Sequence, residues 1–212
     1  MNEKEYTEKA TEYLLNKEYD KAMEYYLKAS DEGYYFAMYN IACMYYFGDG
    51  VEKDDQKAFS WYLKAYEHGD AEAGNRVGVM YENGIGTEKD TYKAFTYYLD
   101  SAKKGSLSAM ANTGMCYLNA TGTEKNIDEG IRWMDQASEK GNGIASTELG
   151  DDYFLGNHVV KDISKAIFYY ERGVKQRYKP AAEKLADIYE NNGDSVKGEE
   201  YRNIVENMIE ED

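Results

Sequence analysis

Small and apolar residues recur along the chain at the spacing of amphipathic helices, and glycine-containing segments separate the stripes that they form. Within residues 36–70 the first stripe has the i, i+4, i+5, i+8 spacing of one helix face and consists of Ala37, Ile41, Ala42 and Tyr45. The second stripe consists of Ala58, Trp61, Tyr62 and Ala65. The two glycines of Gly48-Asp49-Gly50, between the stripes, suit the positive φ angles that end a helix. The stretch is therefore predicted to form helix, loop, helix and a turn at Gly69.

The same pattern returns every 36 residues, which indicates an internal repeat. Alanine opens the first helix of the unit at Ala37, Ala73, Ala109, Ala145 and Ala181. A small residue follows at Ala42, Gly78, Gly114, Gly150 and Ala186. The predicted N-caps of the second helix are Asp54, Asp90, Asn126 and Asp162. Small residues let helices approach closely, so Gly78 and Gly114 are expected where neighbouring helices touch.

The stretch from Ala37 to Gly69 resembles the Sel-one-like repeat family, a relative of the tetratricopeptide repeat. It follows that family's consensus, roughly A-x3-LG-x2-Y-x2-G-x-GV-x3-D-x2-KA-x2-WY-x2-A-x3-G. Three departures are Val77-Gly78 for Leu-Gly, Glu129-Gly130 for Lys-Ala, and His158 where other loops have glycine. The resemblance implies an all-α, right-handed α-α superhelix of about six antiparallel helix pairs, and a scaffold rather than an enzyme.

The ends of the chain differ from its middle in loop length. In the central units the small residue of the second helix follows that of the first by 16 positions, as Ala58 follows Ala42. At the two ends this separation is only 12 positions, from Ala10 to Ala22 and from Ala186 to Gly198. Terminal repeats are expected to be atypical because their outer face meets water. We therefore predict a single solenoid over 1–212, with capping pairs at 1–34 and 179–212 and four 36-residue units over 35–178.

Composition narrows the possible partners and locations. A net charge of −15 disfavours nucleic acid, whose phosphates require a basic surface. The longest apolar run, residues 41–47, is too short to span a membrane, and residues 1–13 have no apolar signal-peptide core. Cys43 and Cys116 lie about two units apart and are expected to be free thiols, in keeping with a reducing compartment. The cytoplasm is the expected location unless a signal peptide has been removed, and a monomer is the expected state.

Few residues suggest catalysis or metal binding. His68 and His158 do not converge, so no metal or other cofactor is expected. Ser101-Ala102-Lys103-Lys104 matches the Ser-x-x-Lys motif of penicillin-binding enzymes, and cysteine-rich relatives of the repeat family have been credited with weak activity toward penicillins. The accompanying Ser-Asp-Asn and Lys-Thr-Gly motifs are missing, and Ser101 is expected on the surface of a second helix. A β-lactamase-like enzyme is therefore the alternative, not the preferred hypothesis.

In the related tetratricopeptide fold the first helix of each pair lines a concave groove. The resemblance implies that the corresponding positions of each repeat line such a groove here. The predicted partner-binding residues are Phe36, Tyr39, Tyr46, Glu72, Asn75, Val79, Glu82, Met115, Leu118, Asp151 and Phe154. These columns contain no lysine or arginine, which disfavours a clamp for a peptide carboxylate. Glu72 and Glu82 instead favour a partner with basic residues, with Asn75 bonding to its backbone.

The main hypothesis is a non-catalytic adaptor that binds a protein or peptide in this groove, with Tyr39 and Tyr46 as aromatic anchors. The second interpretation of these tyrosines is that they pack against neighbouring helices and only stiffen the solenoid. A self-associating structural solenoid is the third hypothesis for the chain as a whole.

Overall fold

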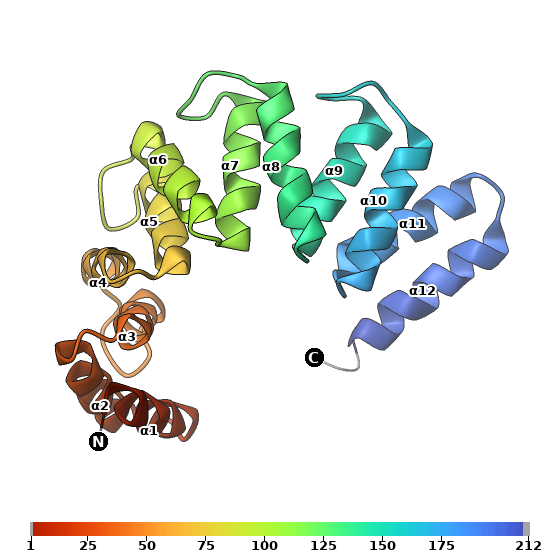
Figure 1. The fold of residues 1–212 in the computed structure, drawn as a ribbon. Helices are drawn as coiled ribbons and strands as arrows, with labels where there is room; N and C mark the ends of the chain where they lie inside the picture. Colours follow the sequence, from red (N-terminus) through yellow and green to blue (C-terminus); the bar gives the residue numbers. More distant parts are fainter. Residues whose placement is uncertain (1, 210–212) are drawn as a thin grey trace. The chain divides into compact units, whose positions relative to one another are not determined.

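The computed structural model describes residues 2–209, which form twelve α-helices and no strand. The helices follow one another as α1 (Glu3–Leu15), α2 (Tyr19–Asp31), α3 (Tyr35–Phe47), α4 (Asp55–Glu67), α5 (Ala71–Asn83), α6 (Thr91–Lys103), α7 (Leu107–Asn119), α8 (Ile127–Glu139), α9 (Gly143–Leu155), α10 (Ile163–Lys175), α11 (Lys179–Asn191) and α12 (Ser195–Ile209). Consecutive helices lie side by side as pairs (Figure 1). The predicted all-α architecture of paired helices is confirmed; residue 1 and residues 210–212, at the outer ends of the predicted capping pairs, lie outside the described residues.

The chain divides into two compact units, Met1–Ala109 and Met110–Asp212. The first unit contains α1 to α6 and the beginning of α7. The second contains the rest of α7 and α8 to α12.

Side-chain caps and left-handed residues set the ends of the helices. The predicted N-caps all accept a hydrogen bond from the backbone N–H three residues on, at 2.9–3.1 Å; they are Asp54, Asp90, Asn126 and Asp162. Gly48, Gly84 and Gly156 end their helices with φ of 80°, 70° and 78°. Ala120 stands at the equivalent position of α7 with φ of 57°, a conformation that alanine adopts at a cost.

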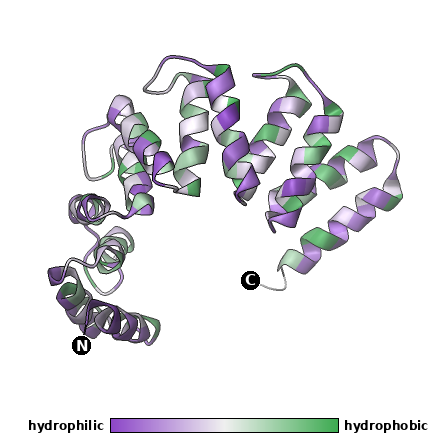
Figure 2. Cartoon of the chain, viewed as in Figure 1, coloured by the Kyte–Doolittle hydropathy of each residue, from purple (hydrophilic) through white to green (hydrophobic). Residues whose placement is uncertain are grey.

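Glycines of the first helix form the seam on which the second helix packs. A Cβ atom at Gly78 would lie 2.5 Å from Cε1 of Tyr98, and one at Gly114 would lie 2.6 Å from Cγ of Met134. Both glycines therefore lie where helices touch, as the sequence predicted. Because polar residues occupy the opposite face, single helices carry both hydrophobic and hydrophilic segments (Figure 2).

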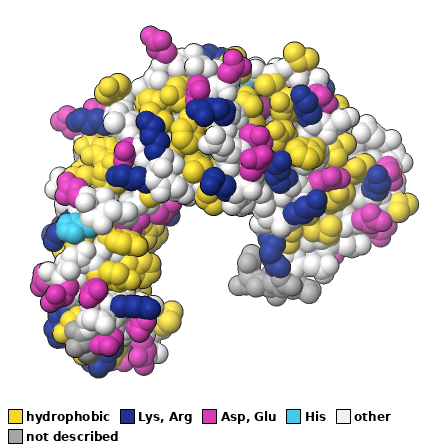
Figure 3. Space-filling model, in the orientation of Figure 1, with side chains coloured by type: hydrophobic (Ala, Val, Ile, Leu, Met, Phe, Trp, Pro, Cys, Tyr) yellow, Lys and Arg dark blue, Asp and Glu magenta, His cyan; other side chains and the backbone are white. Residues whose placement is uncertain are grey.

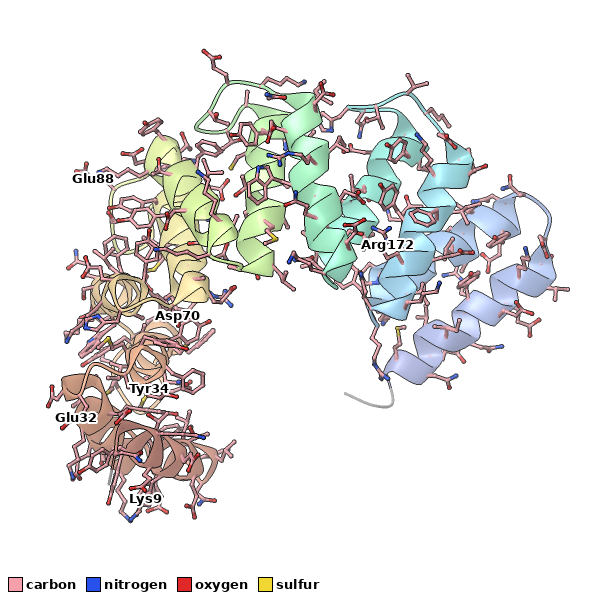
Figure 4. All side chains as sticks on the ribbon, viewed as in Figure 1. Lys9, Glu32, Tyr34, Asp70, Glu88 and Arg172 are labelled. Atoms are coloured by element: carbon pink, nitrogen blue, oxygen red, sulfur yellow. The ribbon has the colours of Figure 1, made fainter. Side chains whose placement is uncertain are left out.

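Polar side chains also join the second helices of neighbouring pairs. In the first unit the Tyr66 hydroxyl of α4 donates to Asp100 of α6. In the second unit Arg172 of α10 donates to Asp135 and to the Ser138 hydroxyl of α8, at 3.1 and 2.9 Å (Figure 4). These contacts fix the spacing of consecutive pairs within each unit.

The long loops lie over the beginning of the preceding second helix. Gly50 approaches α2 so closely that a Cβ would lie 1.9 Å from Cβ of Tyr19, and a Cβ at Gly86 would lie 2.0 Å from the backbone oxygen of Asp55 in α4. The last pair has no such loop, because only residues 192–194 connect α11 to α12. The beginning of α10 therefore lacks the cover that the loops give to α2 and α4.

Candidate functional site

A hollow of about 70 Å³ lies between α3, α4 and α5 in the first unit. It is lined by Tyr39, Cys43, Tyr46, Phe47, Tyr62, Arg76, Val79 and Met80. Three of the predicted groove residues, Tyr39, Tyr46 and Val79, therefore meet at one place. The rim is open, since 68% of Phe47 is exposed.

A larger hollow of about 530 Å³ lies between α9, α10 and α11 in the second unit. It is lined by Asp151, Phe154, Leu155, Lys161, Ile163, Tyr170, Lys184, Asp187, Ile188, Asn191 and Asn192. It includes the predicted residues Asp151 and Phe154. Ile163 is the first residue of α10, so the hollow opens where the last pair has no long loop.

The two hollows occupy the same position in the repeat, since most of their residues correspond at a distance of three 36-residue repeats. The corresponding pairs are Cys43 and Asp151, Tyr46 and Phe154, Phe47 and Leu155, Tyr62 and Tyr170, Arg76 and Lys184, Val79 and Asp187, and Met80 and Ile188. The fold thus forms one recurring site from two consecutive first helices and the second helix between them. Each unit has its own version of this site.

The second helix directs a tyrosine hydroxyl into each hollow. The Tyr62 hydroxyl lies 3.2 Å from Sγ of Cys43, and the Tyr170 hydroxyl donates to Oδ1 of Asp151 at 2.6 Å. Burial raises the pKa of both the Cys43 thiol and the Tyr62 hydroxyl, so both groups stay protonated at neutral pH. The first hollow therefore offers a protonated thiol where the second has a carboxylate.

A cation also occupies each hollow, and the sequence interpretation missed it. Nε of Arg76 donates to the Tyr39 hydroxyl at 3.3 Å, and Nζ of Lys184 donates to both carboxylate oxygens of Asp151 at 2.8 and 3.1 Å. The positions predicted to line the groove contain no lysine or arginine, but a neighbouring position of the first helix brings a cation to each hollow. Both cations stand at one position of the repeat that was not among those carried over from the tetratricopeptide fold. In successive repeats this position is occupied by Asn40, Arg76, Asn112, Glu148 and Lys184.

Two predicted contact residues are core residues. Asn75 is 4% exposed, and its amide donates to Oε1 of Glu72 at 3.2 Å, so it is not presented to a ligand backbone. Leu118 is 1% exposed because it fills the space left by Gly130, where a Cβ would lie 2.6 Å from Cγ of Leu118. Their assignment to an open groove is corrected accordingly.

The remaining predicted residues lie outside the two hollows. Glu72 also accepts from the Ser106 hydroxyl at 2.8 Å, and Glu82 accepts from the Tyr98 hydroxyl at 2.8 Å. Both carboxylates are thus engaged by side chains of the protein itself. Phe36 is 46% exposed and contacts Tyr34 at the edge of a separate shallow hollow beside α1. Met115 of α7 is partly buried and lines neither hollow.

Ser101 is fully buried, contrary to the expected surface position. Its hydroxyl lies against the α5 backbone, since a Cβ at Gly74 would be 2.2 Å from Oγ of Ser101. Lys104 is ion-paired with Asp100 at 2.8 Å. The Ser-x-x-Lys motif therefore does not present an accessible nucleophile.

Within residues 2–209 no group of histidine, cysteine or acidic residues is placed to hold a metal ion. No helix in that range is long and apolar enough to cross a bilayer. Both cysteines are free thiols, as predicted. Acidic, basic and hydrophobic side chains are interspersed on the face shown in Figure 3.

The family model of the Sel1 repeat matches the chain at residues 8–34, 36–70, 71–106, 107–142 and 144–178. No curated protein sequence matches the chain. These matches cover α1 from residue 8 onward and α2 to α10, and leave α11 and α12 outside.

Several solved structures have a similar fold. A Sel1 repeat protein from Oxalobacter formigenes is 26% identical, with a TM-score of 0.86 over 97% of this chain and 88% of its own. A protective antigen with an SLR fold from uropathogenic Escherichia coli is 24% identical, with a TM-score of 0.74 over 89% of this chain and 41% of its own. An immunity protein from Pseudomonas aeruginosa is 24% identical, with a TM-score of 0.68 over 98% and 86%. The last two similarities concern the fold alone.

Proposed function

Because the chain belongs to the Sel1 repeat family, whose members are commonly protein-interaction scaffolds, we propose that it is a non-catalytic adaptor that binds a protein or peptide. The binding face is formed by α3 and α5 of the first unit and centres on Tyr39, Tyr46 and Val79. A cytoplasmic monomer is part of the proposal, in keeping with the two free thiols.

The observation that carries this proposal is the open aromatic hollow of the first unit. Tyr39 and Tyr46 are only partly buried, and Phe47 is exposed beside them. Aromatic side chains that remain accessible around a concave site are typical anchors of protein interfaces. Tyr39 also packs edge-on against Tyr62 with ring centroids 5.2 Å apart, so its ring is already ordered before a partner arrives.

Capture of partners from the source lysate tests the proposal when the bait is compared with matched variants. Tyr39→Ala with Tyr46→Ala removes the two anchors. Tyr92→Ala removes an aromatic side chain of the same unit that is exposed on α6 and lines neither hollow. We expect wild type and Tyr92→Ala to retain the same protein, and the double variant to lose it.

Circular dichroism melting separates loss of binding from loss of folding. The double variant is expected to keep its helix content and melt within a few degrees of wild type, because the two tyrosines lie at the rim of the core. A double variant that still captures the protein would disprove the proposed face. Light scattering of the free chain at high concentration tests self-association, since a mass above that of one chain supports the structural hypothesis instead.

A further inference from the structure

We propose that the first hollow binds an acidic side chain of the partner, with Arg76 pairing its carboxylate and the aromatic hollow receiving a small apolar side chain next to it. The inference rests on the proposed function, because it names the chemistry of the partner at that same face. It replaces the basic partner that Glu72 and Glu82 suggested.

Three other arginines of the chain form ion pairs within the described residues, and Arg76 does not. Arg132 pairs with Glu129, Arg172 with Asp135, and Arg202 with two acidic residues of α11. Within residues 2–209 no carboxylate lies at ion-pair distance from Arg76; its side chain donates to the Tyr39 hydroxyl instead. Arg76 is exposed, so its guanidinium is accessible to a ligand.

The natural partner of Arg76 on its own helix is held elsewhere. Glu72 precedes Arg76 by four residues, the spacing at which side chains on a helix pair. Its two carboxylate oxygens accept from Asn75 at 3.2 Å and from Ser106 at 2.8 Å. The Glu72 carboxylate therefore acts on Arg76 through space without an ion-pair contact, and the guanidinium keeps its donors for a second anion.

The second unit shows the same site with the carboxylate already present. There Lys184, the counterpart of Arg76, donates to Asp151 at 2.8 Å, and the tyrosine of the second helix donates to the same carboxylate. In the first unit Cys43 takes the place of Asp151. A ligand carboxylate bound beside Cys43 would thus complete an arrangement that this chain builds for itself three repeats later.

The geometry of the hollow favours a carboxylate over other anions. A guanidinium binds a carboxylate through two parallel N–H donors, and Tyr39 holds the side chain of Arg76 through Nε, which leaves the terminal amino groups for a ligand. The adjacent space of about 70 Å³ suits a small aliphatic side chain rather than an aromatic ring.

The test uses short Gly-Ser peptides, acetylated and amidated, with central Val-Glu, Val-Gln, Val-Lys or Gly-Glu. The shift of the Arg76 Nε–H signal in ¹H–¹⁵N NMR spectra reports each titration. We expect Val-Glu to bind at least about tenfold more tightly than Val-Gln and Val-Lys, and more tightly than Gly-Glu. Equal binding of Val-Glu and Val-Gln, or preference for Val-Lys, would overturn the inference. The inference would also be overturned if a Val-Gln peptide with a free C-terminus bound more tightly than the Val-Glu peptide. That result would assign the site to a terminal carboxylate.

Two substitutions at Cys43 provide matched controls. Cys43→Asp places a carboxylate where the second unit has Asp151 and is expected to occupy Arg76 internally, which removes the preference for Val-Glu. Cys43→Asn has nearly the same shape without the charge and should retain that preference. Arg76→Gln removes the Nε–H reporter, so its titration is followed through the backbone amides around the hollow, and the preference for Val-Glu should be lost. Chemical shifts over the remaining amides show whether each variant is folded, and unchanged Val-Glu binding by folded Cys43→Asp contradicts the inference.

The outcomes separate this inference from the proposed function. If the Val-Glu peptide shows no preference while the Tyr39 and Tyr46 double variant still loses its captured protein, the adaptor stands and the acidic partner is rejected. If the peptide binds as expected but the double variant keeps its protein, the hollow binds acidic side chains while the main interface lies elsewhere.

Discussion

Lys184 of α11 donates to Asp151 of α9 at 2.8 Å, and the pair occupies the position that Arg76 and Cys43 hold in the first unit. The same backbone site thus occurs in the chain once with an internal ion pair and once without it. This difference makes the second unit a built-in reference for the chemistry of the first.

Asp151→Asn is predicted to convert the second hollow into a binder of acidic side chains. The substitution removes the ion-pair partner of Lys184, on which Glu148 then acts only through space, and it preserves an acceptor for the Tyr170 hydroxyl. The ion pair is partly exposed, so the free energy of unfolding should change by less than about 1 kcal/mol. NMR titration with the Val-Glu peptide should give new shifts around Lys184, and none with Val-Gln. Absence of those shifts would show that a free cation is insufficient at this site.

Ala120→Gly is predicted to stabilise the protein. Ala120 has φ of 57°, where other repeats use glycine, and relief of this strain outweighs the greater flexibility of glycine in the unfolded chain. We expect a gain of about 0.5–1 kcal/mol in urea unfolding. The converse change, Gly156→Ala, should destabilise by a similar amount because Gly156 has φ of 78°. A loss of stability in Ala120→Gly would contradict this account.

Gly78→Ala is predicted to destabilise the seam between α5 and α6. The added Cβ would lie 2.5 Å from the ring of Tyr98, which cannot move without disturbing the core. The expected cost is about 1–3 kcal/mol in chemical unfolding. In a Tyr98→Leu background the same change should cost less, because the clashing ring is gone. Equal costs in both backgrounds would place the strain elsewhere.

Asp100→Asn is predicted to weaken stability at neutral pH but not in acid. Hydrogen bonds from Lys104 and Tyr66 hold the pKa of Asp100 below its ordinary value of 3.8. Because the pKa of Asp100 is lower in the folded than in the unfolded state, its ionised carboxylate stabilises the fold above pH 3.8. That stabilisation disappears as the pH falls through the folded-state pKa. The melting-temperature difference between variant and wild type should therefore shrink toward low pH. A difference that stays constant with pH would assign the effect to packing.

The repeat pattern made much of the fold predictable. Residues that recur every 36 positions located the helices. Asp54 could be identified as a helix cap, and Gly78 as a residue of the helix–helix seam, because these roles depend on local chemistry and side-chain size. Burial at single positions was less predictable. Leu118 turned inward because Gly130, across the pair, replaces an alanine and leaves space, which is a tertiary effect.

The candidate site was predicted in part for the same reason. Tyr39 and Tyr46 could be identified because large aromatic residues stood outside the core columns. Arg76 was missed because its role depends on a side chain crossing from α5 to Tyr39 of α3, and on Glu72 being held by a residue 34 positions further along the chain. No period within the sequence reports such contacts.

Site-specific photo-crosslinking tests the central claim most directly. A benzoylphenylalanine at Phe47, on the rim of the first hollow, is compared with one at Tyr92, which is equally exposed on α6 of the same unit. If the face of α3 and α5 binds a protein partner, irradiation in the source lysate should link the Phe47 probe to one discrete protein, and addition of Tyr39→Ala with Tyr46→Ala should abolish that product. Crosslinks to the same protein from Tyr92 alone, or a Phe47 product that persists in the double variant, would contradict the account.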